Sequence, residues 1–148
     1  MRAVIQRVQN ATVEAESVTV STIGQGLLVF LGAEKGDGEK DASYLAGRIL
    51  RLRVFEEPRG RMNKSVLDIE GEVLVVSQFT LAADLRRGNR PSFDSAEAPA
   101  RAEQLYIFFM EELRQAGAKV KAGVFGADMK VSLVNDGPVT FVMDSRPD

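Results

Sequence analysis

The 148-residue chain contains no cysteine, no histidine and no tryptophan. The absence of cysteine excludes a disulfide framework, a thiolate nucleophile and a thiolate metal site. The absence of histidine excludes Ser-His-Asp and Cys-His catalysis, the HExxH zinc pattern and the commonest general base at neutral pH. We see no cluster of other metal ligands, although carboxylates alone would favour a hard cation. We therefore expect a protein that uses neither a metal nor a cofactor.

The chain also lacks a long apolar run and a strong charge of one sign. Its longest apolar run, Leu27 to Leu31, is far shorter than the roughly 20 residues that span a bilayer. The start, Met1 to Arg7, has no signal-peptide core. We therefore expect a soluble cytoplasmic protein without a membrane partner. The net charge of -2 means that any contact with nucleic acid must be local, since proteins that coat duplexes are basic.

The patterning predicts one domain, residues 1–148, with strands grouped around two helices. We expect strands in 1–34, a helix capped by Asp37, a strand over 72–81, a helix opening at Pro99 and three closing strands. The closing strands fall at 119–125, at 128–134 and through Phe141, and the last follows a turn at 135–138. This β-β-β-α-β-α-β-β-β order predicts an α+β fold, a mixed or antiparallel sheet or partial β-barrel with two main helices, rather than a doubly wound sheet.

Both predicted helices have one apolar face. On the first helix the face carries Ala42, Leu45, Ala46, Ile49 and Leu50. On the second it carries Ala102, Leu105, Tyr106, Phe109 and Leu113. These faces predict the core, with Gly117 as the cap at the end of the second helix.

The strand over 72–81 is apolar on both faces and then becomes polar without becoming a turn. Val73 to Val76 are all apolar, whereas Ser77, Gln78 and Thr80 are polar. Buried polar groups cost about 1–3 kcal/mol each when unpaired. These side chains therefore either form hydrogen bonds at the strand end or line a cleft.

Two loops are further candidates for function. Asn135 to Thr140 has turn composition, and its glycine would allow a ligand to approach the backbone closely. The connection 82–97 is longer than most loops and holds Arg86, Arg87 and Arg90, a cationic patch suited to phosphate. The alternatives are a plain turn and a solvated loop.

Together, Ser77-Gln78-Phe79-Thr80 and Asn135-Asp136-Gly137-Pro138-Val139-Thr140 resemble the SQxT and NxGPxT motifs of the D-aminoacyl-tRNA deacylase family. The resemblance covers nearly the whole chain. It extends to Ile5–Val8, Gly26–Val29, Met62-Asn63, Arg90–Phe93 and Gly126–Met129.

The resemblance implies a homodimeric hydrolase with active sites at the subunit interface. It would cleave the ester between a D-amino acid and the terminal adenosine of tRNA, and would also remove mischarged glycine. By this resemblance, Ser77, Gln78, Phe79 and Thr80 line the catalytic pocket. Gly137-Pro138 is a cis dipeptide that enters the partner's pocket and excludes L-amino acids, with Arg7 as its buttress. Phe125 and Met129 help to seat the adenosine, and Arg86, Arg87 and Arg90 are candidates for tRNA phosphates.

The chemistry leaves the nucleophile open. Backbone N–H groups near Gln78 to Thr80 would stabilise the oxyanion. A Thr80 nucleophile needs a base, and the Ser77–Thr80 motif contains none. The 2′-hydroxyl of the tRNA is the more economical assistant. Two alternatives are a non-catalytic module that binds RNA 3′ ends and a purely structural domain.

Overall fold

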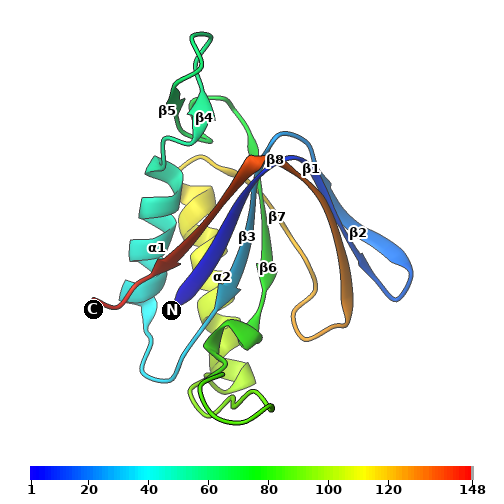
Figure 1. Cartoon of the computed structure of the whole chain (residues 1–148), viewed down its shortest axis with the longest axis vertical. Helices are drawn as coiled ribbons and strands as arrows, with labels where there is room; N and C mark the ends of the chain where they lie inside the picture. Colours follow the sequence, from blue (N-terminus) through cyan, green and yellow to red (C-terminus); the bar gives the residue numbers. More distant parts are fainter. Residues whose placement is uncertain (148) are drawn as a thin grey trace.

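The computed structural model describes residues 1–147, and its elements confirm the predicted α+β class (Figure 1). Two helices accompany a mixed sheet and a small hairpin. In chain order the elements are β1 (Arg2–Ala15), β2 (Val18–Ile23), β3 (Gly26–Gly32), α1 (Glu39–Arg51), β4 (Phe55–Glu56), β5 (Met62–Lys64), β6 (Glu72–Ser77), the 3-10 turn η1 (Phe79–Ala82), α2 (Pro99–Gln115), β7 (Lys119–Ala122) and β8 (Met129–Asp144). Neither helix in residues 1–147 is long and apolar enough to span a bilayer.

The main sheet combines parallel and antiparallel pairs. Its order is β2-β1-β3-β6-β7, and β8 pairs with β1 off this path. Strands β3, β6 and β7 are parallel, whereas β1 is antiparallel to β2, β3 and β8. The second half of β1 and the first half of β8 curve away from the helices together with β2. This curvature gives the sheet its partly barrel-like shape (Figure 1).

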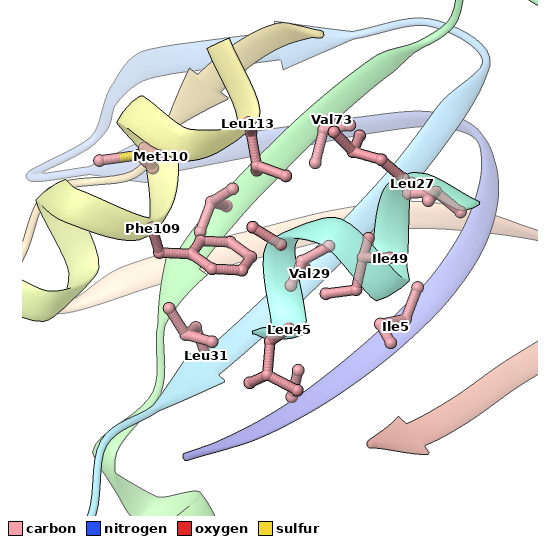
Figure 2. Close-up of a cluster of buried hydrophobic side chains, with 14 of the residues drawn as sticks. Ile5, Leu27, Val29, Leu31, Leu45, Ile49, Val73, Phe109, Met110 and Leu113 are labelled. Carbon is pink, nitrogen blue, oxygen red and sulfur yellow. The ribbon is translucent and has the colours of Figure 1, made fainter. Parts of the chain in front are cut away.

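The two faces of β6 belong to two apolar clusters, as the double-sided pattern predicts. Val73 and Val75 face α1 and α2 in the larger cluster, and Leu74 and Val76 lie in the smaller one on the other side. Burial of each large aliphatic side chain contributes about 1.5–3 kcal/mol. Figure 2 shows the larger cluster, which includes Ile5, Leu27, Val29, Leu31, Leu45, Ile49, Phe109, Met110 and Leu113.

Helix α1 begins one residue later than predicted, because Gly38 rather than Asp37 is its N-cap. The Asp37 carboxylate instead accepts the Glu34 N–H at 2.7 Å and lies 2.7 Å from the terminal ammonium of Met1. Both partners of this ion pair are fully buried. Asp37 also binds the guanidinium of Arg146 at 3.0 Å, so it joins the two ends of the described chain.

Two further expectations were wrong in detail, and one element was not predicted. The strand predicted to reach Leu81 ends at Ser77, where η1 follows. The two strands predicted on either side of Asn135–Pro138 form one long strand, β8, with a break in its register. The β4–β5 hairpin was not predicted, because its strands contain only two and three residues.

Candidate active site

A cavity of about 630 Å³ opens at the carboxyl ends of β3 and β6. Its walls come from these strand ends, from η1, from the start of α2 and from the turn that leads into β8. The lining residues include Met1, Leu31, Gly32, Ala33, Val76, Ser77, Gln78, Phe79, Phe93, Glu97, Ala98, Tyr106, Phe125, Ala127 and Met129. The polar strand end that the sequence singled out therefore faces a cleft.

The Ser77–Thr80 segment forms one rim of this cavity. The Gln78 backbone N–H donates to the Leu31 carbonyl at 2.8 Å, which fixes the segment to the end of β3. The Gln78 side-chain amide donates to the Thr80 hydroxyl. The Phe79 ring is more than half exposed and stands edge-on to Phe93, with centroids 5.1 Å apart. Ser77, Gln78 and Phe79 line the cavity, whereas Thr80 does not.

The opposite wall is aromatic and apolar. The Tyr106 hydroxyl donates to the Val75 carbonyl at 3.0 Å, and burial raises the pKa of Tyr106 to about 12. Its ring lies 5.8 Å from that of Phe125. Met129, the first residue of β8, completes this wall. Sequence reasoning placed Tyr106 in the core but missed its place in the cavity, because its helical spacing is that of an ordinary core residue.

The Gly137-Pro138 dipeptide lies away from this cavity. In the ladder between β1 and β8, Gln6 pairs with Thr140 and Val8 with Asn135, so four residues of β8 lie opposite Arg7 alone. These residues bulge out as an exposed bend, and the Gly137-Pro138 peptide bond in it is cis. The bend lies beside the start of β3, whereas the cavity lies at the other end of this strand. At ~3.3 Å per residue, the bend and the cavity are about 17 Å apart along β3.

Two side chains hold the bend. Arg7 is buried, and its Nε donates to the Asp136 carbonyl at 2.9 Å while its Nη1 donates to the Val54 carbonyl at 2.7 Å. Asn135 accepts the Val139 N–H at 2.8 Å and donates to the Val139 carbonyl at 3.2 Å. Sequence reasoning treated Asn135 only as a turn former. The general ability of Asn to bind nearby backbone groups was the available signal.

The predicted phosphate-binding arginines are exposed, but only two of them are free of a carboxylate. Arg86 donates two bonds to the Asp84 carboxylate, at 2.6 and 2.9 Å. These bonds hold the pKa of Asp84 well below its usual range. Arg87 and Arg90 have no ion pair among residues 1–147. In the same range, no three potential metal-binding side chains form a group.

The protein is a mixed α+β domain with a cavity at the ends of its parallel strands, and motif residues lie on the rim of this cavity. These features place it in the class of ligand-binding or catalytic domains. A family model described as D-Tyr-tRNA(Tyr) deacylase matches residues 4–144. The chain belongs to this family of ester hydrolases, which confirms the membership and the enzyme class that the sequence predicted.

Curated relatives share this assignment. The chain is 60% identical to a D-aminoacyl-tRNA deacylase of Paracoccus denitrificans, over 98% of this chain and 97% of the relative. It is 53% identical to one of Geobacter sulfurreducens, over 99% and 96%.

Two solved structures have the same fold. One, titled c-Myc DNA Unwinding Element Binding Protein, has a TM-score of 0.95 and 42% identity over 99% of this chain and 100% of that chain. Another, titled as a probable eukaryotic D-amino acid tRNA deacylase, has a TM-score of 0.79 at 18% identity, over 97% of this chain and 98% of the other. This second similarity shows the fold alone.

Proposed function

We propose that the protein hydrolyses the ester that joins a D-amino acid to the 3′-terminal adenosine of tRNA, and that it also removes mischarged glycine. The observation that carries the proposal is the Ser77–Phe79 segment on the rim of a 630 Å³ cavity, in a chain of this family. The cavity is large enough for a ligand of drug-like size. The substrate is the aminoacylated acceptor end of tRNA.

The active site forms between two copies of the chain. The cavity and the Gly137-Pro138 bend lie at opposite ends of β3 and β6, so the bend cannot reach the cavity of its own chain. Before and after the bend, β8 exposes three large apolar side chains, and exposed apolar surface is a feature of association sites. They are Val134, Phe141 and Val142. A homodimer that covers this surface would bring the bend of one copy to the cavity of the other.

Within the cavity, Phe125 and Met129 seat the adenosine on the apolar wall. Gly137 and Pro138 of the second copy face the Cα atom of the aminoacyl group and leave no room for an L-side chain. A repulsive element of this kind is what discrimination requires, since L-aminoacyl-tRNA must survive. Glycine has no side chain to reject and enters as well.

Hydrolysis depends on oriented donors and on the substrate itself. The N–H groups of Phe79 and Thr80 open the η1 turn, so they have no partner inside it and are available to the developing oxyanion. One such donor contributes about 3–4 kcal/mol. Glu97 is the carboxylate that lines the cavity, and it already accepts the Ala98 N–H at 2.8 Å. With no base at Thr80, the ribose 2′-hydroxyl assists the attacking water.

The test is hydrolysis of D-tyrosyl-tRNA and L-tyrosyl-tRNA by the purified protein, with and without a chelator. We expect rapid loss of the D-ester alone, unchanged by the chelator. Binding of tRNA without hydrolysis of either ester would favour the module that binds RNA 3′ ends. Equal loss of both esters would contradict the role of Gly137-Pro138.

A second substrate tests the mechanism. A tRNA that ends in 2′-deoxyadenosine and is charged at its 3′-hydroxyl with D-tyrosine lacks the assisting group. We expect its hydrolysis to be at least a hundredfold slower. Hydrolysis as fast as that of the normal substrate would rule out assistance by the 2′-hydroxyl.

A further inference from the structure

The β4–β5 hairpin carries a concentration of positive charge that the proposed site does not use. Residues 53–64 contain four Lys or Arg and two Glu, a net charge of +2 in a chain whose total is -2. We define the hairpin cluster as Arg53, Arg59, Arg61 and Lys64. Local positive charge against an acidic background is the electrostatic pattern expected of a nucleic-acid contact.

The cations of this cluster are available to a ligand. Among residues 1–147, none of the four lies within 4 Å of a carboxylate. The pKa of the nearby Asp68 is lowered by its hydrogen bonds to Ser65 and, more weakly, by the charges of Arg53 and Lys64. The two glutamates of the hairpin are occupied. Glu57 accepts a hydrogen bond from Asn63, and Glu56 lies 3.8 Å from Arg7. By contrast, Arg86 in the loop 82–97 is neutralised by Asp84, so that loop offers less free charge than its sequence indicates.

The hairpin is joined to the Gly137-Pro138 bend through one side chain. Arg7 donates to the Val54 carbonyl at the base of the hairpin and to the Asp136 carbonyl in the bend. The hairpin projects beyond the ends of both helices on the side of the molecule where β8 bends (Figure 1). The extended segment from Val54 to Glu57 spans about 10 Å at ~3.3 Å per residue, and the turn with Arg59 and Gly60 lies beyond it. Arg7 therefore connects the bend to the base of the hairpin.

We infer that the hairpin cluster binds phosphates of the acceptor stem of the tRNA whose 3′ end occupies the cavity of the partner copy. This inference rests on the proposed function. When the bend of one copy reaches the partner's cavity, Arg7 places the hairpin of that same copy beside the cavity mouth. The acceptor stem is the phosphate-rich duplex that adjoins the 3′ end. Guanidinium groups bind phosphate oxygens in bidentate geometry, which suits Arg59 and Arg61 at the exposed tip.

The test compares a full tRNA with a substrate that has no stem. The substrates are D-tyrosyl-tRNA and the trinucleotide CCA charged with D-tyrosine, and the variant is Arg59→Glu with Arg61→Glu. We expect kcat/KM for the tRNA to fall at least tenfold and that for the trinucleotide to stay within twofold. The slope of log kcat/KM against log salt concentration for the tRNA should flatten by about 2, one for each lost phosphate contact.

The matched control is Arg114→Glu with Lys119→Glu, which changes the net charge equally at the exposed end of α2 and the start of β7. It should leave the rates for both substrates within twofold. An equal loss in the control would mean that net charge alone is responsible, and would overturn the inference. Equal losses on tRNA and trinucleotide would mean that the hairpin variant disturbs the cavity, and would also overturn it.

Failure of the proposed function gives a different result. If the unmodified protein hydrolyses neither substrate, the deacylase proposal fails. If it hydrolyses both and the hairpin variant is unchanged on tRNA, only the inference fails. In the neutral variant Arg59→Gln with Arg61→Gln, the logarithm of kcat/KM for the tRNA should fall about half as much as in the Glu variant. This comparison distinguishes the loss of attraction from the repulsion that Glu introduces.

Discussion

At the scale of single residues, Gly137 sits where the backbone leaves least room. A Cβ atom there would lie 2.6 Å from both the Val139 nitrogen and its Cγ2 atom, and its φ of +153° strains any other residue. We therefore expect Gly137→Ala to shift the bend and to lower kcat/KM for D-tyrosyl-tRNA at least tenfold. The control is Gly117→Ala, which has a similarly strained φ of +98° but open space around it. Similar losses of activity in the two variants would attribute the effect to strain in the fold.

Thr80 is the residue at which the two mechanisms differ most. Thr80→Val keeps the shape and removes the hydroxyl, which within residues 1–147 accepts a hydrogen bond only from Gln78. With the 2′-hydroxyl of the substrate assisting water, kcat should fall no more than about tenfold. Removal of a true nucleophile costs about a millionfold in kcat in a well-studied serine protease. A single-turnover rate reduced by more than a thousandfold would identify Thr80 as the nucleophile.

At the scale of elements, the loop before α1 depends on a buried ion pair. Asp37 holds the Met1 ammonium and Arg146, and Met1 in turn lines the cavity. Asp37→Asn leaves the buried Met1 ammonium without its counter-ion, and removing one partner of a buried pair costs about 3–5 kcal/mol. The free energy of unfolding in urea should fall by that amount, whereas exposed Asp94→Asn should change it by less than about 0.5 kcal/mol. A loss below 1 kcal/mol for Asp37→Asn would show that this ion pair does not stabilise the fold.

The elements also show what the sequence could and could not predict. The apolar faces of α1 and α2 and the double-sided burial of β6 follow from short-range periodicity, and both were predicted correctly. The ends of elements depended on longer-range contacts. Asp37 is a good N-cap by type, but its carboxylate is taken by the ammonium of Met1. Asn135 to Pro138 has turn composition, yet pairing with β1 on both sides makes it a bulge inside one strand.

At the scale of the whole molecule, the arrangement explains why the two motifs cannot act within one chain. Ser77 to Phe79 lie at one end of β3 and β6, and the bend held by Arg7 lies at the other. No local pattern in the sequence revealed this separation. The resemblance alone indicated a shared site, whereas the separation supplies a physical reason for two copies. In the proposed dimer, the hairpin cluster lies beside the partner's cavity.

The most direct test of the account is to mix two inactive variants. Ala98→Trp fills the cavity of its own chain from an exposed lining position, and Gly137→Ala displaces the bend. In a mixed dimer, one site combines the intact cavity of the second variant with the intact bend of the first. If the two chains are co-expressed in equal amounts, half of the dimers are mixed. The account then predicts recovery of about a quarter of the unmodified D-tyrosyl-tRNA hydrolysis. No recovery from two variants that fold and associate normally would contradict a site built from two chains.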